Sequence, residues 1–355
     1  MLDKKEVYPK VDPGGMKELI ESFPVQFQLA RKNTHEVDFS NIDTERINNI
    51  VVCGMGGSAI GGDLVKSYLL NTIEVPIYIN RDYSIPAFVN QHTLVVGSSY
   101  SGNTEETLNA FKVAGKAGAQ RVAVSTGGKI AGICQAESIP IVTLPGGLPP
   151  RAALGYSFTP FLTILEILDL IENQDNYLEE TVEILKRGIE LYGPDNPADD
   201  NPAKELAAQL HGKLPLIYSD DNHFNSAAVR FRGQINENAK QLAYSAVFPE
   251  NNHNELVGWK HLDGLSEILV AIYLYDSSIA SRVKFRMRFF SEIQNNLGVE
   301  TYSIESRGES LLARIFSVIQ YCDWISYYMA ILNQEDPMPV KIIDKLKSSL
   351  ASFKG

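Results

Sequence analysis

The sequence predicts an α/β protein with two domains, each built on a doubly wound parallel sheet that helices cover on both faces. Three observations favour this class. Short apolar runs alternate with helical segments in the first half, which is typical of a parallel sheet. A proline-rich break follows, and the same alternation then begins again. The length of 355 residues also favours two domains over one.

Five strands are predicted in the first half, each as a short apolar run bounded by turn residues. Residues 58–70 and 104–118 have helical spacing and alternate with these strands. The most apolar helical stretch is 156–171, but Glu166 and Asp169 interrupt it, which predicts a core helix and no membrane span. The predicted strands are residues 49–53, 74–80, 92–98, 121–126 and 139–145.

The predicted linker is YGPDNPADDNPA at residues 192–203, which contains three prolines and no apolar periodicity. It separates a first domain, 1–191, from a second domain, 204–355, that ends in a C-terminal helical segment. The two halves resemble an internal duplication. The second half lacks glycine-rich and hydroxyl-rich turns, so we expect the first half to bind phosphate and the second to supply different chemistry. The second half has predicted strands at 215–221, 265–276 and 299–306, and predicted helices at 224–240, 281–297 and 309–333.

Composition excludes several classes of partner. The net charge of −11 argues against nucleic acid or an anionic membrane as the main partner. Cys53, Cys134 and Cys322 are too far apart in the sequence for a disulfide framework or a metal cluster, which favours a reducing cytosol. The charged N-terminus, MLDKKEVYPK, lacks the apolar core of a signal peptide. We therefore expect a cytoplasmic protein.

A glycine-rich turn, VVCGMGGSAIGGD (51–63), joins the first predicted strand to its helix. Glycines allow a close backbone approach, and the helix N-terminus offers unpaired amides to an anion. Two alternatives stay open. The turn also matches a dinucleotide fingerprint, but that fold requires an acid at the end of the second strand, where Asn80 and Arg81 stand, with Asp82 just beyond. The glycines could also serve only tight packing.

A hydroxyl-rich turn, VVGSSYSGNTEET (95–107), follows the third predicted strand. Capping the next helix requires a single hydroxyl, and this turn contains four. A dinucleotide fold has no need of a second such turn. Together the two turns predict a cradle for the phosphate of a small metabolite. The four hydroxyl residues are Ser98, Ser99, Ser101 and Thr104.

Two segments, GGSAIGGD and SYSGNTEET, resemble the sugar isomerase (SIS) domain. Four further segments resemble one branch of that family. They are LPPRAALGYSF (148–158), NENAK (236–240), PENNHNE (249–255) and the DP…LK segment (336–347). This branch is the bifunctional phosphoglucose/phosphomannose isomerase family, which has two SIS domains. The resemblance covers nearly the whole chain. It implies a homodimer that interconverts glucose 6-phosphate, mannose 6-phosphate and fructose 6-phosphate, with no metal or other cofactor.

The resemblance also implies roles for individual residues. Glu237 matches the base that removes the carbon-2 proton, and Arg151 the cation that stabilises the enediolate. His253 and Lys347 would assist ring opening. The resemblance implies that His253 acts in the active site of the other chain, across a twofold interface. The implied phosphate-binding residues are Gly56, Gly57, Ser58, Ser99, Ser101 and Thr104.

The residue types alone leave alternatives to these roles. Glu250 and Glu255 suit the base as well as Glu237 does, and Lys341 or Lys345 could replace Lys347. Each candidate also has a purely structural interpretation: a salt bridge for the arginine, a loop histidine, or a solvated helix residue for the glutamate and the lysine.

Motif spacing disfavours other chemistries. The sequence has no His-x-His, His-x-x-x-His or Cys-x-x-Cys spacing for a metal and no Walker phosphate loop for ATP. A SIS-domain sugar-phosphate sensor is the main alternative, but a sensor has no need of all four catalytic candidates. A nicotinamide-dependent oxidoreductase ranks last.

Overall fold

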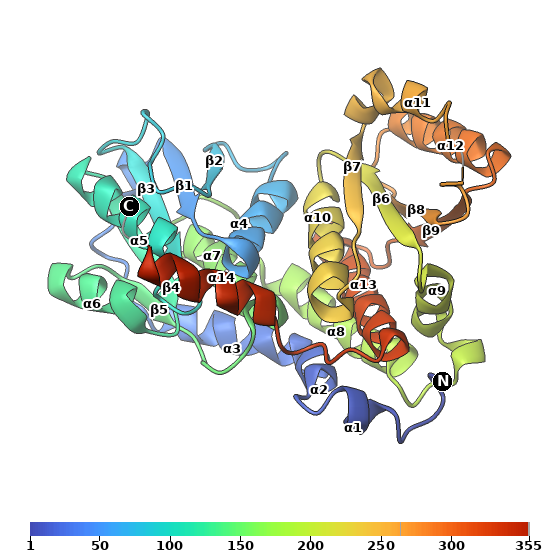
Figure 1. Ribbon diagram of the computed structural model, residues 1–355. Coiled ribbons are helices and arrows are strands. Elements are labelled where there is room, and N and C mark those ends of the chain that lie inside the picture. Colours follow the sequence, from blue (N-terminus) through green and yellow to red (C-terminus); the bar gives the residue numbers. More distant parts are fainter. Residues whose placement is uncertain (263, 354–355) are drawn as a thin grey trace.

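Two parallel sheets form the framework of the protein (Figure 1). The structure is a computed structural model that describes residues 1–262 and 264–353. The first sheet has the strand order β2-β1-β3-β4-β5, and the second has the order β7-β6-β8-β9. The predicted α/β class with two parallel sheets is confirmed. The strands are β1 (Asn49–Cys53), β2 (Ile77–Asn80), β3 (Thr93–Ser98), β4 (Gln120–Ser125), β5 (Ile141–Thr143), β6 (Leu214–Asp220), β7 (Tyr244–Phe248), β8 (Leu269–Tyr275) and β9 (Glu300–Glu305).

The second sheet repeats the connectivity of the first four strands, because β6, β7, β8 and β9 take the places of β1, β2, β3 and β4. Strand β7 was not among the predicted strands. Its sequence, YSAVF, is short, and four of its five residues are only partly buried or exposed, as suits an edge strand. An edge strand does not need the continuous apolar run that marks the central strands, which explains why β7 was not predicted.

The central strands of the first sheet explain where the two predicted phosphate turns lie. Strands β1 and β3 are buried along almost their whole length because helices cover both faces of the sheet. They pair in parallel, with Cys53 opposite Gly97. This register brings the carboxyl ends of both strands to the same edge, so the turns that follow them lie next to each other.

Helices surround both sheets, and several short or polar ones were not among the predicted elements. The predicted helix 224–240 divides into α10 and a wider π-helical turn, η4, which ends at a left-handed Lys240 (φ 53°). The longer helices are α3 (Phe23–His35), α4 (Gly56–Tyr68), α5 (Glu105–Lys116), α6 (Gly128–Glu137), α7 (Leu154–Ile167), α8 (Asp175–Tyr192), α9 (Pro202–Leu210), α10 (Asn225–Gln234), α12 (Ser281–Asn296), α13 (Leu311–Asn333) and α14 (Lys341–Ser352). The short elements are α1 (Tyr8–Val11), α2 (Met16–Glu21), α11 (Glu255–Gly258), and the turns η1 (Thr44–Arg46), η2 (Pro150–Ala152), η3 (Ala198–Asp200), η4 (Ile235–Ala239) and η5 (Glu250–His253).

The predicted linker, 192–203, lies between α8 and α9, and its last two residues already belong to α9. Asn201 caps that helix, since its side-chain oxygen accepts from the backbone amides of Ala203 and Lys204. The ammonium of Lys204 is buried against the carbonyls of Pro194 and Asn196 at 2.9 and 2.7 Å. Hydrogen bonds from Lys204 and the cap at Asn201 thus hold residues 192–203 against the start of α9. The division into two domains there stays a prediction, because one apolar core extends through both halves.

Helix α13 lies in that shared core. It is the one helix, among the described residues, that is long and apolar enough to cross a membrane, but 89% of its apolar window is buried inside the protein. It packs against α8, α9 and α10. Trp324, Tyr327 and Tyr328 are completely buried on it. It is a core helix that joins the two halves of the chain.

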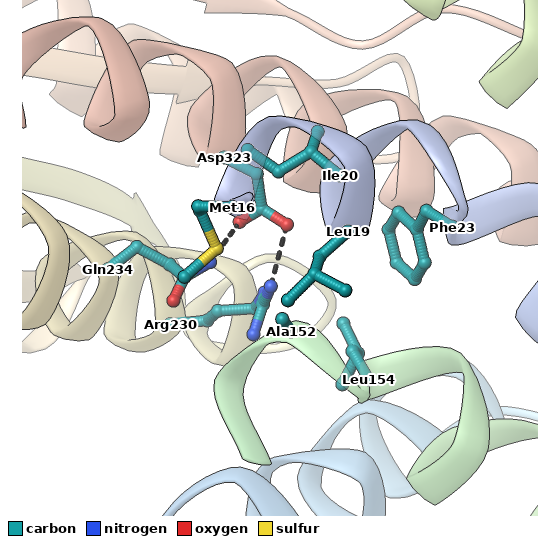
Figure 2. Close-up of a pocket in the computed structure, with 9 residues that line it drawn as sticks. All are labelled: Met16, Leu19, Ile20, Phe23, Ala152, Leu154, Arg230, Gln234 and Asp323. Atoms are coloured by element: carbon teal, nitrogen blue, oxygen red, sulfur yellow. Dashed lines mark hydrogen bonds and ion pairs between the residues drawn. The ribbon is translucent and has the colours of Figure 1, made fainter. Parts of the chain in front are cut away.

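A buried ion pair fastens α10 to α13 (Figure 2). Arg230 Nη2 donates to Asp323 Oδ2 at 2.6 Å, and Gln234 Nε2 donates to Asp323 Oδ1 at 2.8 Å. Burial raises the pKa of Asp323, and the neighbouring Arg230 opposes that shift. The pair lines a cavity of about 10 Å³ beside Ala152, next to the short turn that carries Arg151.

Removing one member of this pair should destabilise the protein strongly. We expect Asp323→Ala to lower the free energy of unfolding by about 3–5 kcal/mol, because it leaves the Arg230 charge buried without a partner. Glu183→Ala, which breaks the exposed pair with Lys186, should cost less than about 1 kcal/mol. Urea unfolding measures both. Equal small losses would mean that the buried pair does not fasten the helices.

Candidate active site

The glycine-rich turn packs directly against the segment that carries Arg151. Helix α4 begins at Gly56, which has a left-handed φ of 49°, and no side chain caps its N-terminus. A Cβ on Gly57 would lie 2.7 Å from the carbonyl oxygen of Pro150. Only glycine fits there without a shift of the backbone. The close approach predicted for this turn is therefore to the Arg151 segment, and the first amides of α4 stay uncapped by side chains.

The hydroxyls of the second turn do not cap helix α5. Thr104 is the N-cap residue, but its side chain makes no capping hydrogen bond. It accepts instead from Ser99 Oγ at 3.1 Å, while Ser58 Oγ accepts from the Tyr100 amide at 3.0 Å and Ser101 Oγ from the Asn103 amide at 3.3 Å.

Within residues 1–262 and 264–353, the hydroxyl protons of Ser58, Ser101 and Thr104 have no acceptor, so they can donate to an anion. They lie at the N-termini of α4 and α5, whose N-cap side chains make no capping hydrogen bond. Ser99 differs, since it is completely buried and its hydroxyl already donates a hydrogen bond to Thr104. Ser98 donates to the Ser58 carbonyl oxygen at 3.0 Å. The capping interpretation therefore does not account for this turn.

Tyr100 connects the two turns to the loop before Arg151. Its amide binds Ser58, its hydroxyl donates to the carbonyl oxygen of Pro145 at 2.7 Å, and that hydroxyl accepts from the Leu148 amide at 3.3 Å. The predicted phosphate turns thus lie next to the loop that leads to Arg151. Sequence reasoning missed Tyr100, although it stands inside the hydroxyl-rich turn.

Arg151 is buried in the short turn η2 and contacts two separate segments, η4 and residues 337–338. Its Nε donates to Asn238 Oδ1 at 2.8 Å and its Nη1 to Glu237 Oε2 at 3.2 Å. Its Nη2 donates to the carbonyl oxygens of Pro337 and Met338. Burial lowers the pKa of Arg151, and the Glu237 carboxylate opposes this. A salt bridge is present, as the structural alternative for Arg151 predicts, and its partner is Glu237, the predicted base.

The structure therefore brings Glu237 and Arg151 together. Glu237 projects from the π-helical turn with 36% of its side chain exposed, and its described contact with the guanidinium uses one carboxylate oxygen. Turns of this type frequently occur at functional sites. The carboxylate is held by a cation and is still accessible from outside.

Lys240 closes the same turn and was not among the candidate residues. Its ammonium donates to the carbonyl oxygens of Glu237, Asn238 and Asp336 at 2.8, 3.3 and 2.6 Å. Burial, followed by the charge of Arg151, lowers its pKa. It ties the turn to the segment before α14. The available signal was its position at the end of the NENAK tract, where cations satisfy helix carbonyls.

His253 does not approach the Arg151–Glu237 pair within one chain. It is exposed in η5, directly after β7, whereas Glu237 precedes β7. The two residues therefore stand at opposite ends of that strand, whose five residues span about 16 Å. In Figure 1, α11 marks the end of the second sheet where this histidine lies.

The two alternative carboxylates share the far end of β7 with His253. Glu255 accepts from Tyr218 Oη and, at 3.3 Å, from Trp259 Nε1. Burial and the Glu255 charge raise the pKa of Tyr218 well above its ordinary range. Glu255 thus anchors the segment 249–255 that contains His253, which we call the histidine loop. Glu250 is exposed in the same segment. Neither lies beside Arg151.

Lys347 also lies away from the pair. Its side chain on α14 is 72% exposed and its described ion pair, at 3.9 Å, is with Asp344. Lys341 and Lys345 are exposed on the same helix. Figure 1 shows α14 crossing in front of the first sheet, at the end of the segment that Arg151 binds.

In the described part of the chain, Asn80 stands where a dinucleotide site has its ribose-binding acid. Among the described residues, no group of three or more His, Cys, Asp or Glu side chains could hold a metal ion. At the end of β2, the side-chain amide of Asn80 donates to the carbonyl oxygens of Asp82 and Ser84 at 3.1 and 2.9 Å. The place of the ribose-binding acid is taken by an amide that is already engaged.

The two parallel sheets, with the turns that follow β1 and β3, are those of a protein of the SIS-domain class. A family model for the bacterial phospho-glucose isomerase C-terminal SIS domain matches residues 199–350. A crystal structure of a hypothetical protein from Thermus thermophilus has a TM-score of 0.75 at 14% identity, covering 99% of this chain and 94% of that chain.

More similar relatives specify the family. The bifunctional phosphoglucose/phosphomannose isomerase of Caldicellulosiruptor bescii is 43% identical over 96% of this chain and 100% of its own length. That of Aquifex aeolicus is 34% identical over 87% of this chain and 92% of its own. The chain belongs to the bifunctional phosphoglucose/phosphomannose isomerase family.

Proposed function

We propose that the protein interconverts glucose 6-phosphate, mannose 6-phosphate and fructose 6-phosphate without a metal or other cofactor. The observation that carries the proposal is the contact between the Arg151 guanidinium and the accessible Glu237 carboxylate. Support also comes from the contacts of Tyr100 and Gly57, which join the turns before α4 and α5 to the segment that carries Arg151. Family membership supports the same reaction.

The substrate phosphate binds at the two turns. The amides of Gly56, Gly57 and Ser58 begin α4, and the dipole of that helix favours an anion at its N-terminus. The free hydroxyl protons of Ser58, Ser101 and Thr104 complete the set of donors. Ser99 contributes by orienting Thr104.

Glu237 then transfers the proton. It removes the proton from carbon 2 of the opened aldose, and the electron pair forms the carbon 1–carbon 2 double bond of a cis-enediolate. The proton of the carbon-2 hydroxyl moves to the carbon-1 oxygen, and the protonated carboxyl returns a proton to carbon 1, which leaves the carbon-2 carbonyl of the ketose. Arg151 stabilises the negative oxygen through a donor that is already in place. For mannose 6-phosphate the proton is removed after the chain rotates about the carbon 2–carbon 3 bond.

Ring opening requires His253 and Lys347, and the dimer supplies the histidine. Because His253 and Glu237 stand at opposite ends of β7, a twofold dimer that places one chain's histidine loop over the other chain's Glu237 would form two composite sites. Lys347 would reach the ring or the carbonyl oxygen by movement of α14. This enzyme would act in the cytoplasm, with neither nucleic acid nor a membrane as partner.

A coupled assay with each aldose phosphate, with and without EDTA, tests the function. We expect turnover of glucose 6-phosphate and mannose 6-phosphate to be unchanged by the chelator. Loss of activity on chelation would contradict a metal-free mechanism. No turnover of either sugar, with binding retained, would instead support the sugar-phosphate sensor. A fluorescence change on adding NAD(P)H would support the oxidoreductase.

The phosphate turns give a prediction of their own. Ser101→Ala with Thr104→Ala should raise KM chiefly, because phosphate contacts serve the ground and transition states alike. Each donor lost to the charged phosphate should cost about 1.5–3 kcal/mol of binding. Thr301→Ala, which removes a surface hydroxyl bonded to Asn295, is the control and should leave KM unchanged. An unchanged KM in the double variant would rule out the phosphate cradle.

A further inference from the structure

A row of polar side chains connects the π-helical turn to α13. Arg230, Gln234 and Asn238 stand four residues apart and all bind α13, the first two through Asp323 and the third through Ser326. Glu237, the residue before Asn238, contacts Arg151. The row fixes the turn that carries the proposed base.

Asn238 is the member of this row that also touches Arg151. It is completely buried, and both ends of its side-chain amide are engaged. Its Oδ1 accepts from Arg151 Nε at 2.8 Å, and its Nδ2 donates to Ser326 Oγ at 3.0 Å. Ser326 in turn donates to the carbonyl oxygen of Asp323 at 2.8 Å. A chain of hydrogen bonds thus extends from the α13 backbone to the guanidinium.

These contacts determine how Arg151 is aimed. A guanidinium is planar and presents its donors in a fixed fork. Asn238 holds the Nε edge, and the carbonyl oxygens of Pro337 and Met338 hold Nη2. Three acceptors on these two nitrogens restrict the orientation of the guanidinium plane, and with it the direction of Nη1. Nη1 is the nitrogen that contacts Glu237.

We propose that Asn238 is a positioning residue, which aims Arg151 at the developing enediolate and sets its separation from Glu237. The proposal rests on the proposed function. It predicts that Asn238 affects turnover through Arg151 and has little effect on substrate binding, since the phosphate turns do not contact it. A residue needed only for packing would instead change stability and leave the turnover of the folded enzyme intact.

A double-mutant cycle tests this proposal. Asn238→Ala should lower kcat by about 10–100-fold with KM nearly unchanged, as expected for a small misplacement of a catalytic group. Arg151→Ala should be slower still, and adding Asn238→Ala to it should change nothing further, because both act through one guanidinium. An additive double variant, or wild-type kcat in Asn238→Ala, overturns the proposal.

Asn333→Ala is the matched control. Asn333 lies on α13, as Ser326 does, and donates to the carbonyl oxygen of Ala239 in η4 at 2.8 Å. Its replacement therefore removes a contact between α13 and η4 that does not involve Arg151. We expect its kcat to match that of wild type, and a loss equal to that of Asn238→Ala would indicate a packing effect. Binding of a phosphorylated sugar acid should survive in every variant.

Ser326→Ala covers the case in which Asn238→Ala does not fold. It removes only the outer anchor of the amide and should lower kcat several-fold at constant KM. Unchanged kcat in this variant would then overturn the proposal. Failure of the proposed function looks different. If Arg151→Ala retains turnover, the catalytic role of the arginine fails and the positioning role fails with it. If Arg151→Ala is inactive but Asn238→Ala keeps the wild-type kcat, only the positioning role fails.

Discussion

Replacing Glu237 by glutamine is expected to lower kcat by about 10²-fold or more, because the amide keeps the shape of the side chain and cannot accept the carbon-2 proton. KM should change little, since the phosphate turns are untouched. The coupled assay measures turnover. Tight binding of a phosphorylated sugar acid should persist and would show that the site is still formed.

Glu250→Gln is the matched control for this variant. Glu250 is exposed at the opposite end of β7 from Glu237, so its replacement should leave kcat unchanged. Near-normal turnover in Glu237→Gln would transfer the base to Glu250 or Glu255. The second of these already accepts hydrogen bonds from Tyr218 and Trp259, and its loss should release the histidine loop instead.

A mixture of two inactive variants is expected to regain activity. Glu237→Gln and His253→Ala should each be nearly inactive alone. When equal amounts are unfolded and refolded together, half of the dimers are hybrids. If His253 acts across a twofold interface, each hybrid contains one intact site, and activity should return to about a quarter of wild type.

The opposite result is equally clear. If His253 serves the site of its own chain, every hybrid site has one defect and the mixture stays inactive. Native mass spectrometry confirms that hybrids have formed. Recovery near zero in their presence would exclude the shared site. The position of His253 beyond β7 makes recovery the expected result.

The elements with strong local signals could be predicted from the sequence, and those that depend on tertiary context could not. Strand β1 is found at the predicted residues 49–53, because NIVVC is a continuous apolar run between turn residues. Strand β7 has no such run and owes its place to pairing with β6. Helix α3 was not among the predicted elements, although Phe23, Phe27 and Ala30 recur on one helical face.

The same distinction applies to the site. The phosphate turns are local features, and their residues stand within a few positions of one another. The contact between Arg151 and Glu237 joins residues 86 positions apart and depends on how α10 crosses α13. Asn238 could not be predicted as a functional residue, because an asparagine next to a glutamate is not a sequence motif for any particular role. Its role depends on contacts to Arg151 and Ser326, neither of which is near in sequence.

Proton transfer through an enediolate is the central claim, and deuterium incorporation tests it most directly. Fructose 6-phosphate is incubated with the enzyme in D₂O, and the products are followed by ¹H NMR. We predict that glucose 6-phosphate and mannose 6-phosphate form with deuterium at carbon 2, and that Glu237→Gln abolishes this incorporation while the variant still binds the sugar acid. Aldose that forms without any deuterium at equilibrium, or incorporation that persists at the wild-type rate in Glu237→Gln, would contradict the account.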